Sequence, residues 1–168
     1  GRGRPGVGRL PGQGSPFVAV GKPEAAPLAV VKSLQFKGGG WAVLALLGKD
    51  AAAELTLWTA AGKQAVVAPA GGVGQTADFA AFSDGGLVAV WSQLQGNGNG
   101  WDVLARRFDK AGKALGDAFV VHAATAGDQR DPAVAVLAGD VFVVSFRNDQ
   151  GKLWLRRFGK DGKPVGIH

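Results

Sequence analysis

The chain has 168 residues, of which 46% are apolar, and this is enough for one domain with a sizeable buried core. It contains no cysteine, which excludes disulfides, thiolate metal sites and cysteine nucleophiles. Lys and Arg number 19 against 13 Asp and Glu, for a formal charge of +6, and no run approaches the roughly 20 consecutive apolar residues of a transmembrane helix.

Residues 1–16 form a basic arm rich in Gly, Pro and Arg. The arm includes Arg2, Arg4 and Arg9 but few large apolar groups, so we expect it to be extended or flexible unless a partner orders it. It could contact phosphate or anionic lipid, although a solvated tail is the simpler interpretation. The chain has no Met and no N-terminal apolar run, which predicts a processed or excised polypeptide.

Residues 17–168 are predicted to form one domain of short repeated strands. The repeat has three units, at residues 28–74, 75–128 and 129–168. The first two units each contain four β-rich runs, and the third repeats the first three of them; Gly- and Asp-containing turns separate the runs. The predicted strands are 28–34, 41–47, 54–58, 65–68, 77–82, 87–91, 103–108, 119–122, 133–137, 141–146 and 153–158.

The register of the repeat can be counted. Gln75 matches Gln129 at a spacing of 54, whereas the Arg pair at 106–107 matches the pair at 156–157 at a spacing of 50. The second unit therefore has four extra residues between its second and third strands, within 95–100. This insertion is the main departure from the repeat.

A short strand is also predicted before the first unit, at residues 17–20. Phe17, Val18 and Val20 lie in a segment, 14–20, that parallels residues 116–122 at a constant spacing of 102. Since residues 119–122 are the fourth strand of the second unit, we expect 17–20 to complete the third unit as its fourth strand, in cis or by exchange between chains.

A repeat of about 50 residues with four strands is typical of a propeller blade. Both faces of the strands carry bulky groups, as expected for a sheet packed between two neighbours, whereas a β-sandwich would show polar alternation. The sequence therefore predicts an all-β, β-propeller-like fold of three four-stranded blades.

Two pairs of phrases carry a resemblance to a known class of repeat. The first is GDQRDPAVAVLAGDVFVVSF followed by LRRFGKDGKPVG, and the second is DGGLVAVW followed by LARRFDKAGKALGDAFVV. They resemble the tandem propeller-type repeats of large bacterial secreted and cell-surface proteins. The resemblance covers residues 14–168 and implies a bacterial protein that is secreted, periplasmic or on the cell surface. It implies nothing about the ligand.

Three blades close poorly into a ring, because closed propellers have about four to eight blades. Two copies of the chain would supply six blades, with the strand at 17–20 exchanged between them, so a homodimer is one expectation. The alternatives are that the chain is a fragment of a longer propeller, or that other protein subunits supply the missing blades.

The residues offer little conventional catalytic chemistry. The two histidines, His122 and His168, have no recurring Ser or carboxylate partner in the sequence, and the spacing of a calcium loop is absent. The Arg pairs at 106–107 and 156–157 are expected to pack their stems between blades and pair with an Asp or a carbonyl, rather than to bind anions. We therefore predict no catalytic residues, metal or cofactor, and no nucleic-acid binding.

Four of the five tryptophans, Trp41, Trp58, Trp91 and Trp154, lie at apolar strand positions and are expected in the core. Trp101 instead follows the inserted loop. In a propeller the turns between second and third strands share a face with the linkers between blades, so a binding face is predicted there. Its candidate residues are Asn97, Asn99, Trp101, Asp128, Arg130, Arg147, Asn148 and Asp149.

These observations lead to the expectation of a non-enzymatic propeller module that recognises a protein or glycan through this face. The alternative is a structural subunit of a larger assembly, anchored by the arm at 1–16.

Overall fold

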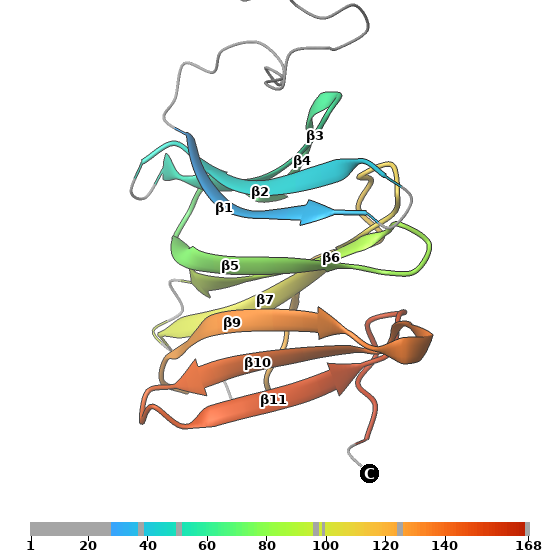
Figure 1. Ribbon diagram of the computed structural model, residues 1–168. Coiled ribbons are helices and arrows are strands. Elements are labelled where there is room, and N and C mark those ends of the chain that lie inside the picture. Colours follow the sequence, from blue (N-terminus) through green and yellow to red (C-terminus); the bar gives the residue numbers. More distant parts are fainter. Residues whose placement is uncertain are drawn as a thin grey trace, which may run out of the picture.

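The structure, a computed structural model, consists of three antiparallel sheets stacked one on another (Figure 1). It describes residues 28–36, 39–49, 52–95, 98, 100–123 and 126–166, without the side chains of Leu28 and Gln75. The predicted arm at 1–16 and strand at 17–20 lie outside the described residues, as do Asn97, Asn99 and His168.

Each sheet is a meander in which strands that follow one another in sequence pair as neighbours. The first sheet contains β1 (Leu28–Gln35), β2 (Trp41–Leu47), β3 (Glu54–Thr59) and β4 (Gly62–Ala68). The second contains β5 (Val73–Ala81), β6 (Leu87–Leu94), β7 (Trp101–Phe108) and β8 (Phe119–Val120). The third contains β9 (Gln129–Val136), β10 (Phe142–Asn148) and β11 (Leu153–Phe158), with the short 3-10 turn η2 (Ala138–Asp140) after β9. The prediction of an all-β class is confirmed.

The first strands of the three sheets pack against one another, β1 on β5 and β5 on β9. Two of them, β5 and β9, begin earlier in the chain than the sequence predicted. β9 begins at Gln129, within the segment expected to be an extended linker, and includes Pro132. Arg130 lies opposite Arg147 and Ala133 opposite Ser145, so the two residues between them form a bulge. A bulge on an edge strand tolerates a proline because no ladder hydrogen bond is lost there.

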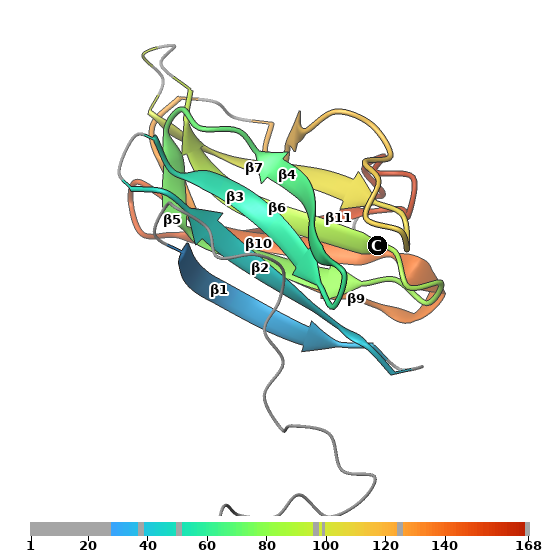
Figure 2. The same cartoon turned by 90° about the horizontal axis from the view of Figure 1, so that it is seen from above.

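The other two inner strands have irregular pairing at a similar place. The register shifts between Val30 and Lys32 in β1 and between Val73 and Ala77 in β5. Bulges bend a strand and redirect its side chains, and they are frequent near functional sites. Seen from above, the three sheets lie over one another and are rotated relative to each other (Figure 2).

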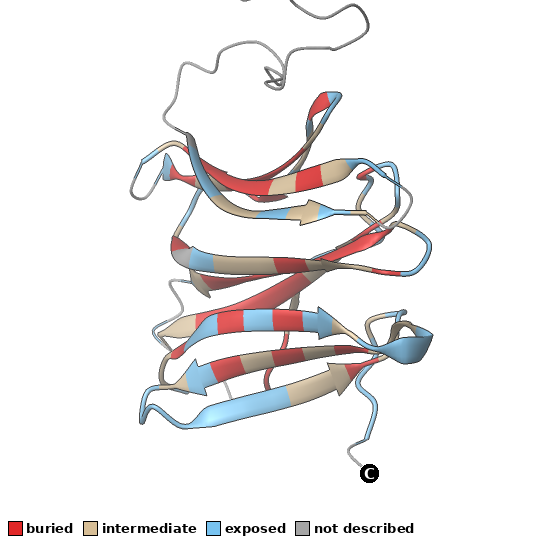
Figure 3. Cartoon of the chain, in the orientation of Figure 1, coloured by how far each residue is buried: buried red, intermediate tan, exposed pale blue. Residues whose placement is uncertain are grey.

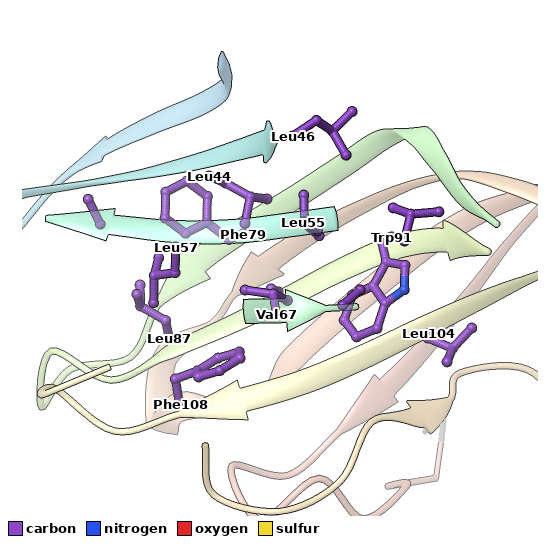
Figure 4. Close-up of a cluster of buried hydrophobic side chains, with 14 of the residues drawn as sticks. Leu44, Leu46, Leu55, Leu57, Val67, Phe79, Leu87, Trp91, Leu104 and Phe108 are labelled. Atoms are coloured by element: carbon purple, nitrogen blue, oxygen red, sulfur yellow. The ribbon is translucent and has the colours of Figure 1, made fainter. Parts of the chain in front are cut away.

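Two hydrophobic clusters hold the sheets together. One lies between the first and second sheets and includes the fully buried Phe79, Trp91 and Phe108 (Figure 4). The other lies between the second and third sheets and includes the buried Phe142 and Phe158. The second sheet is therefore apolar on both faces, which explains why β6 and β7 lack polar alternation.

The expected core positions of the tryptophans are confirmed for Trp58 and Trp91, which are 5% and 1% exposed, while Trp41 is half-buried. The expectation is wrong for Trp154, which is 48% exposed. Trp154 lies on β11, which pairs with β10 but with no further strand in the described part of the chain, and the ammonium of Lys152 lies over its ring at 4.9 Å from the centroid.

The expected pairing of the arginines with backbone carbonyls is confirmed for three of the four, while Nε of Arg157 is buried without a hydrogen-bond partner. These three donate to backbone carbonyls across a turn or between sheets: Arg106 to Gly116, Arg107 to Lys160 and Arg156 to Val121.

The described part of the chain contains no helix with the length and apolar character needed to span a bilayer.

Candidate functional site

The loops at one end of the second and third sheets bring the candidate residues together. We call this surface the loop face and define it by Trp101, Asp128, Arg130, Asp131, Arg147, Asn148 and Asp149. Five of these residues, Asp128, Arg130, Arg147, Asn148 and Asp149, line a small open cavity of about 190 Å³. Of the residues that the sequence singled out for this face, Asn97 and Asn99 lie outside the described residues.

Trp101, which follows the inserted loop, contacts the segment that leads into β9. Its backbone N–H donates to Oδ1 of Asp128 at 3.0 Å, and the guanidinium of Arg130 lies over its ring at 4.7 Å from the centroid. Arg130 in turn donates to Oδ2 of Asp128 at 2.9 Å. One ring face of Trp101 is thus covered by the guanidinium of Arg130.

Glycines allow these close approaches. Gly100 has φ +90°, and a Cβ there would collide with Oδ1 of Asp128. Gly74, on β5, has the ring of Trp101 within 2.9 Å of where a Cβ would stand. A side chain at either position would push the indole or the carboxylate out of place.

The electrostatics of Asp128 follow from these contacts. Its pKa lies below its ordinary value, chiefly because the backbone N–H of Trp101 bonds the carboxylate, with the hydrogen bond and charge of Arg130 acting in the same direction. Asp128 is therefore an ionised anchor of the loop face near neutral pH.

Asp131 has an unusual backbone conformation. Its φ is +57°, a left-handed value that is uncommon for residues other than glycine, and it lies in the bulge of β9. Arg147 donates to its Oδ2 from Nη2 at 2.6 Å and from Nε at 3.0 Å, so Oδ1 is not engaged by that guanidinium. Strained residues held by their surroundings are frequent at functional sites.

A larger cleft of about 940 Å³ opens beside Asp131, between the first and second sheets. Its lining includes Trp101, Arg130 and Asp131 together with residues of β1 and the glycines 72 and 74. The bulges of the three inner strands thus border one cleft. The sequence singled out Trp101 and Arg130 but missed Asp131, although its position before a proline in the first strand of a unit was visible.

His122 has a carboxylate neighbour that the sequence analysis did not find. The antiparallel register that pairs Leu104 with Val120 continues past the end of β8 and sets Asp102 opposite His122. Nε2 of His122 lies 3.4 Å from Oδ1 of Asp102, and both side chains are at most 3% exposed. Because Nε2 accepts the N–H of Val103 at 3.2 Å, it cannot also donate to Asp102 in this tautomer.

The described residues contain no group of three or more His, Asp or Glu side chains placed to hold a metal ion.

No protein-family model matches the sequence, and no curated protein matches it. Among solved structures, the chain is similar to an endo-arabinase from Bacteroides thetaiotaomicron VPI-5482, with a TM-score of 0.54 and 10% identity over 87% of this chain and 58% of that one. It also aligns with a GH43 endo-arabinanase from Bacillus licheniformis, with a TM-score of 0.42 and 16% identity over 83% of this chain and 56% of the other. The chain spans less than two thirds of the length of either enzyme.

The fold is that of a β-propeller. Endo-arabinanases of this kind are five-bladed β-propellers, in agreement with the propeller-type repeat inferred from the sequence. At 10% identity the likeness concerns the fold, and the substrate and activity of that enzyme are statements about that enzyme.

The expectation of a non-enzymatic binding module is corrected by this comparison, because a solved structure with a similar fold is an enzyme, a glycoside hydrolase. The sequence argument against catalysis considered histidine-centred triads and metal sites. Glycoside hydrolysis needs neither, since it runs on a pair of carboxyl groups. The loop face has three such groups, Asp128, Asp131 and Asp149.

Proposed function

We propose that the chain is a carbohydrate-active propeller domain of the glycoside hydrolase type, with its substrate cleft at the loop face. The observation that carries the proposal is Asp131: a carboxylate held in a left-handed backbone conformation by a bulge, oriented by Arg147, and lining the cleft between the first and second sheets. The endo-arabinase fold supports the same reaction class.

The cleft suits an extended polar substrate. Its volume of about 940 Å³ is at the upper end of small-molecule sites, and it is open to solvent rather than enclosed. Its walls combine apolar strand residues with the Arg130 guanidinium, the Asp131 carboxylate and the hydroxyls of Thr76 and Ser92, which hydrogen-bond each other at 3.0 Å. This mixture matches a sugar, which has apolar ring faces and a rim of hydroxyl groups.

We assign Asp131 the role of the carboxylate that activates water or attacks the sugar. Oδ2 is held by Arg147, which leaves Oδ1 to accept a proton or form the bond. The second carboxyl group required for glycoside hydrolysis would protonate the leaving oxygen. Asp149 is our candidate, since it lines the adjoining cavity and is not bonded to Arg147 or Arg130 as Asp131 and Asp128 are.

Arg130 and Trp101 act as one unit in this proposal. The guanidinium covers the indole and is tied to Asp128, so the pair presents a flat, partly cationic surface at the mouth of the cleft. Such a surface would orient a sugar hydroxyl by hydrogen bonds rather than stack on a bare ring.

The length of the match supports the three-blade repeat. The endo-arabinase is five-bladed and the chain spans 58% of it, which corresponds to about three blades. We further propose a secreted, periplasmic or cell-surface location, from the repeat resemblance.

The decisive experiment incubates the purified chain with a panel of polysaccharides, arabinan among them, and measures the release of reducing ends. We expect release from at least one glycan, and we expect Asp131→Asn to reduce the rate by about a hundredfold or more, the usual contribution of a positioned acid or base. Asp161→Asn is the matched control, because Asp161 accepts the Lys163 N–H in a turn at the other end of the sheets and asparagine can accept it too. Activity that survives Asp131→Asn unchanged would refute the assignment. The absence of release from every glycan, together with no binding of oligosaccharides, would refute the proposed function.

A further inference from the structure

The outer edge of β11 differs from the corresponding edges of the other two sheets. In the first sheet β3 pairs with β4, and in the second β7 pairs with β8. Among the described strands β11 pairs with β10 alone, and only the C-terminal end of its outer edge is paired, by a bridge between Phe158 and Pro164. An unpaired edge leaves a row of backbone donors and acceptors ready to bind another strand.

The side chains of β11 are exposed where their counterparts are buried. Leu153, Trp154 and Leu155 are 72%, 48% and 49% exposed, and they follow their counterparts in β7 by 50 residues. Those counterparts, Val103, Leu104 and Ala105, are 0%, 8% and 0% exposed. Figure 3 shows the contrast, since β7 carries buried segments whereas most of β11 is exposed. Three large apolar side chains in a row on an unpaired edge mark a surface that a partner covers.

The sequence contains a segment that fits this edge. Residues 14–20 match residues 116–122, and the matched segment includes β8, the strand that covers β7. In the second sheet Ala105 pairs with Phe119 and Leu104 with Val120. Transferring this register to the third sheet pairs Leu155 with Phe17 and Trp154 with Val18.

The spacing along the chain decides which copy supplies the segment. In the second unit, β8 ends at Val120 and the first strand of the next sheet begins nine residues later, at Gln129. Val18 corresponds to Val120, and β1 begins ten residues after it, at Leu28. The residues between β8 and β9 connect the last strand of one sheet to the first strand of the sheet packed on it. By analogy, a strand at 17–20 would belong to a sheet packed on the outer side of the first sheet.

The third sheet of the same chain does not occupy that position, because β1 and β11 lie at opposite ends of the stack (Figure 1). Eight residues from position 20 to Leu28 reach at most about 28 Å when fully extended. Crossing two sheet spacings takes about 20 Å, and reaching beyond the third strand takes roughly 14 Å at right angles to it, so the straight line is about 24 Å. A connection in cis would therefore need an almost fully extended linker, whereas the linker of similar length in the second unit leads only to the next sheet. The linker length thus favours a second copy as the donor of the strand.

We propose that the β11 edge binds residues 17–20 of a second copy of this chain. The exchange is reciprocal under two-fold symmetry, so that each chain's first sheet packs on the free face of the other chain's third sheet. One partner then accounts for both kinds of exposure: the added strand covers Trp154, and the packed sheet covers Leu153 and Leu155, which point away from the second sheet. This inference does not depend on the enzymatic proposal.

The first test is the mass in solution, by light scattering or native mass spectrometry. We expect twice the 17.1 kDa of one chain. In the second sheet the N–H of Val121 donates to the carbonyl of Val103 at 2.9 Å, so the corresponding bond runs from Ala19 to Leu153. Ala19→Pro removes that donor and should give a monomer with an unchanged circular dichroism spectrum of the folded sheets. Val7→Pro, in the arm but outside the matched segment, should remain a dimer.

The second test exploits the absence of cysteine in the chain. Val18→Cys and Trp154→Cys are prepared as separate single variants, mixed, and oxidised. A disulfide-linked heterodimer is expected, because each cysteine meets its partner only across two chains. Val18→Cys mixed with Leu94→Cys, an exposed position away from the β11 edge, is the control and should form no more linked product than random collision gives.

Three results would overturn the proposal. A wild-type mass of one chain excludes the dimer. A double variant, Val18→Cys with Trp154→Cys, that closes an internal disulfide in a monomer shows that the strand binds in cis. Mixing that yields no heterodimer for this pair, nor for Phe17→Cys with Leu155→Cys, shows that the segment does not occupy this edge.

Discussion

The ammonium of Lys32 on β1 lies 2.5 Å from Oδ1 of Asp78 on β5, and the second oxygen of the same carboxylate accepts the backbone N–H of Val134 on β9 at 2.9 Å. The Asp78 side chain is 14% exposed and that of Lys32 is 40% exposed. A single carboxylate therefore joins the inner strands of all three sheets, close to the bulges that border the cleft.

Asp78→Ala should lower the free energy of unfolding by about 1–3 kcal/mol, because it leaves the N–H of Val134 without its partner. Lys32→Ala should cost at most about 1 kcal/mol, since the half-exposed ammonium gains little from the ion pair. Urea denaturation followed by circular dichroism measures both. Equal losses in the two variants would mean that the ion pair, not the bond to β9, makes the contribution.

Phe142 is the aromatic residue on which the contact between the second and third sheets depends. It is fully buried, stacks on Phe158 with centroids 5.1 Å apart, and meets Phe82 edge to face at 5.9 Å. Phe142→Ala should destabilise the fold by about 3–5 kcal/mol, and Phe142→Leu by less than about 1.5 kcal/mol because it keeps most of the volume. Chemical denaturation of the two variants side by side checks this. A leucine variant as unstable as the alanine variant would point to ring stacking rather than volume.

Two glycines of the inserted loop provide a matched pair. Gly98 and Gly100 have φ of +80° and +90°, but a Cβ at Gly98 meets nothing within 4 Å, whereas one at Gly100 collides with Asp128. Alanine at either site should cost about 1–2 kcal/mol of backbone strain. Only Gly100→Ala should also move the carboxylate away from the N–H of Trp101, which the amide chemical shift of Trp101 reports by NMR. An unchanged shift in Gly100→Ala would contradict the packing of this loop.

An exposed polar cluster at the other end of the sheets should give a pH-dependent contribution to stability. Lys160 donates to Asp84 at 2.7 Å, and Ser83 donates to Asp140 from its N–H at 2.8 Å and its hydroxyl at 2.5 Å. The hydrogen bond from Lys160 is the main cause of a lowered pKa of Asp84, and those from Ser83 are the main cause of a lowered pKa of Asp140. The hydrogen bond to Asp84 is likewise the main cause of the raised pKa of Lys160.

The sign of the effect follows from these directions. A lowered carboxyl pKa stabilises the fold above the ordinary value of 3.8, and that stabilisation is lost as pH falls below it. A raised lysine pKa stabilises the fold below 10.5, and this is lost as pH rises above it. The difference in urea midpoint between the wild type and Lys160→Ala should therefore be largest between about pH 5 and pH 10 and shrink on both sides. A difference that is constant from pH 3 to pH 11 would rule out the ion pair as its source.

Much of the fold could be predicted from the sequence because its signals are local. The 50-residue repeat, the β-rich runs and the Gly-containing turns predicted the strands and their order, and the shared end of the linkers and the turns between second and third strands predicted which residues would lie together. Trp101, Asp128, Arg130 and Arg147 do lie on one face. What the local pattern could not provide was the start of β9, where a bulge lets Pro132 stay within the strand.

The candidate site depended on contacts between sheets that sequence spacing does not encode. Arg130 on β9 lies over Trp101 on β7, which is 29 residues earlier in the chain and in another sheet. Within the third sheet, Arg147 orients Asp131 across the bulge. The sequence alone determined the repeat, because the β-rich runs and the turn residues that separate them are local features. Only the tertiary structure decided which charges meet and which apolar side chains remain uncovered, because both depend on how separate sheets twist and pack against one another.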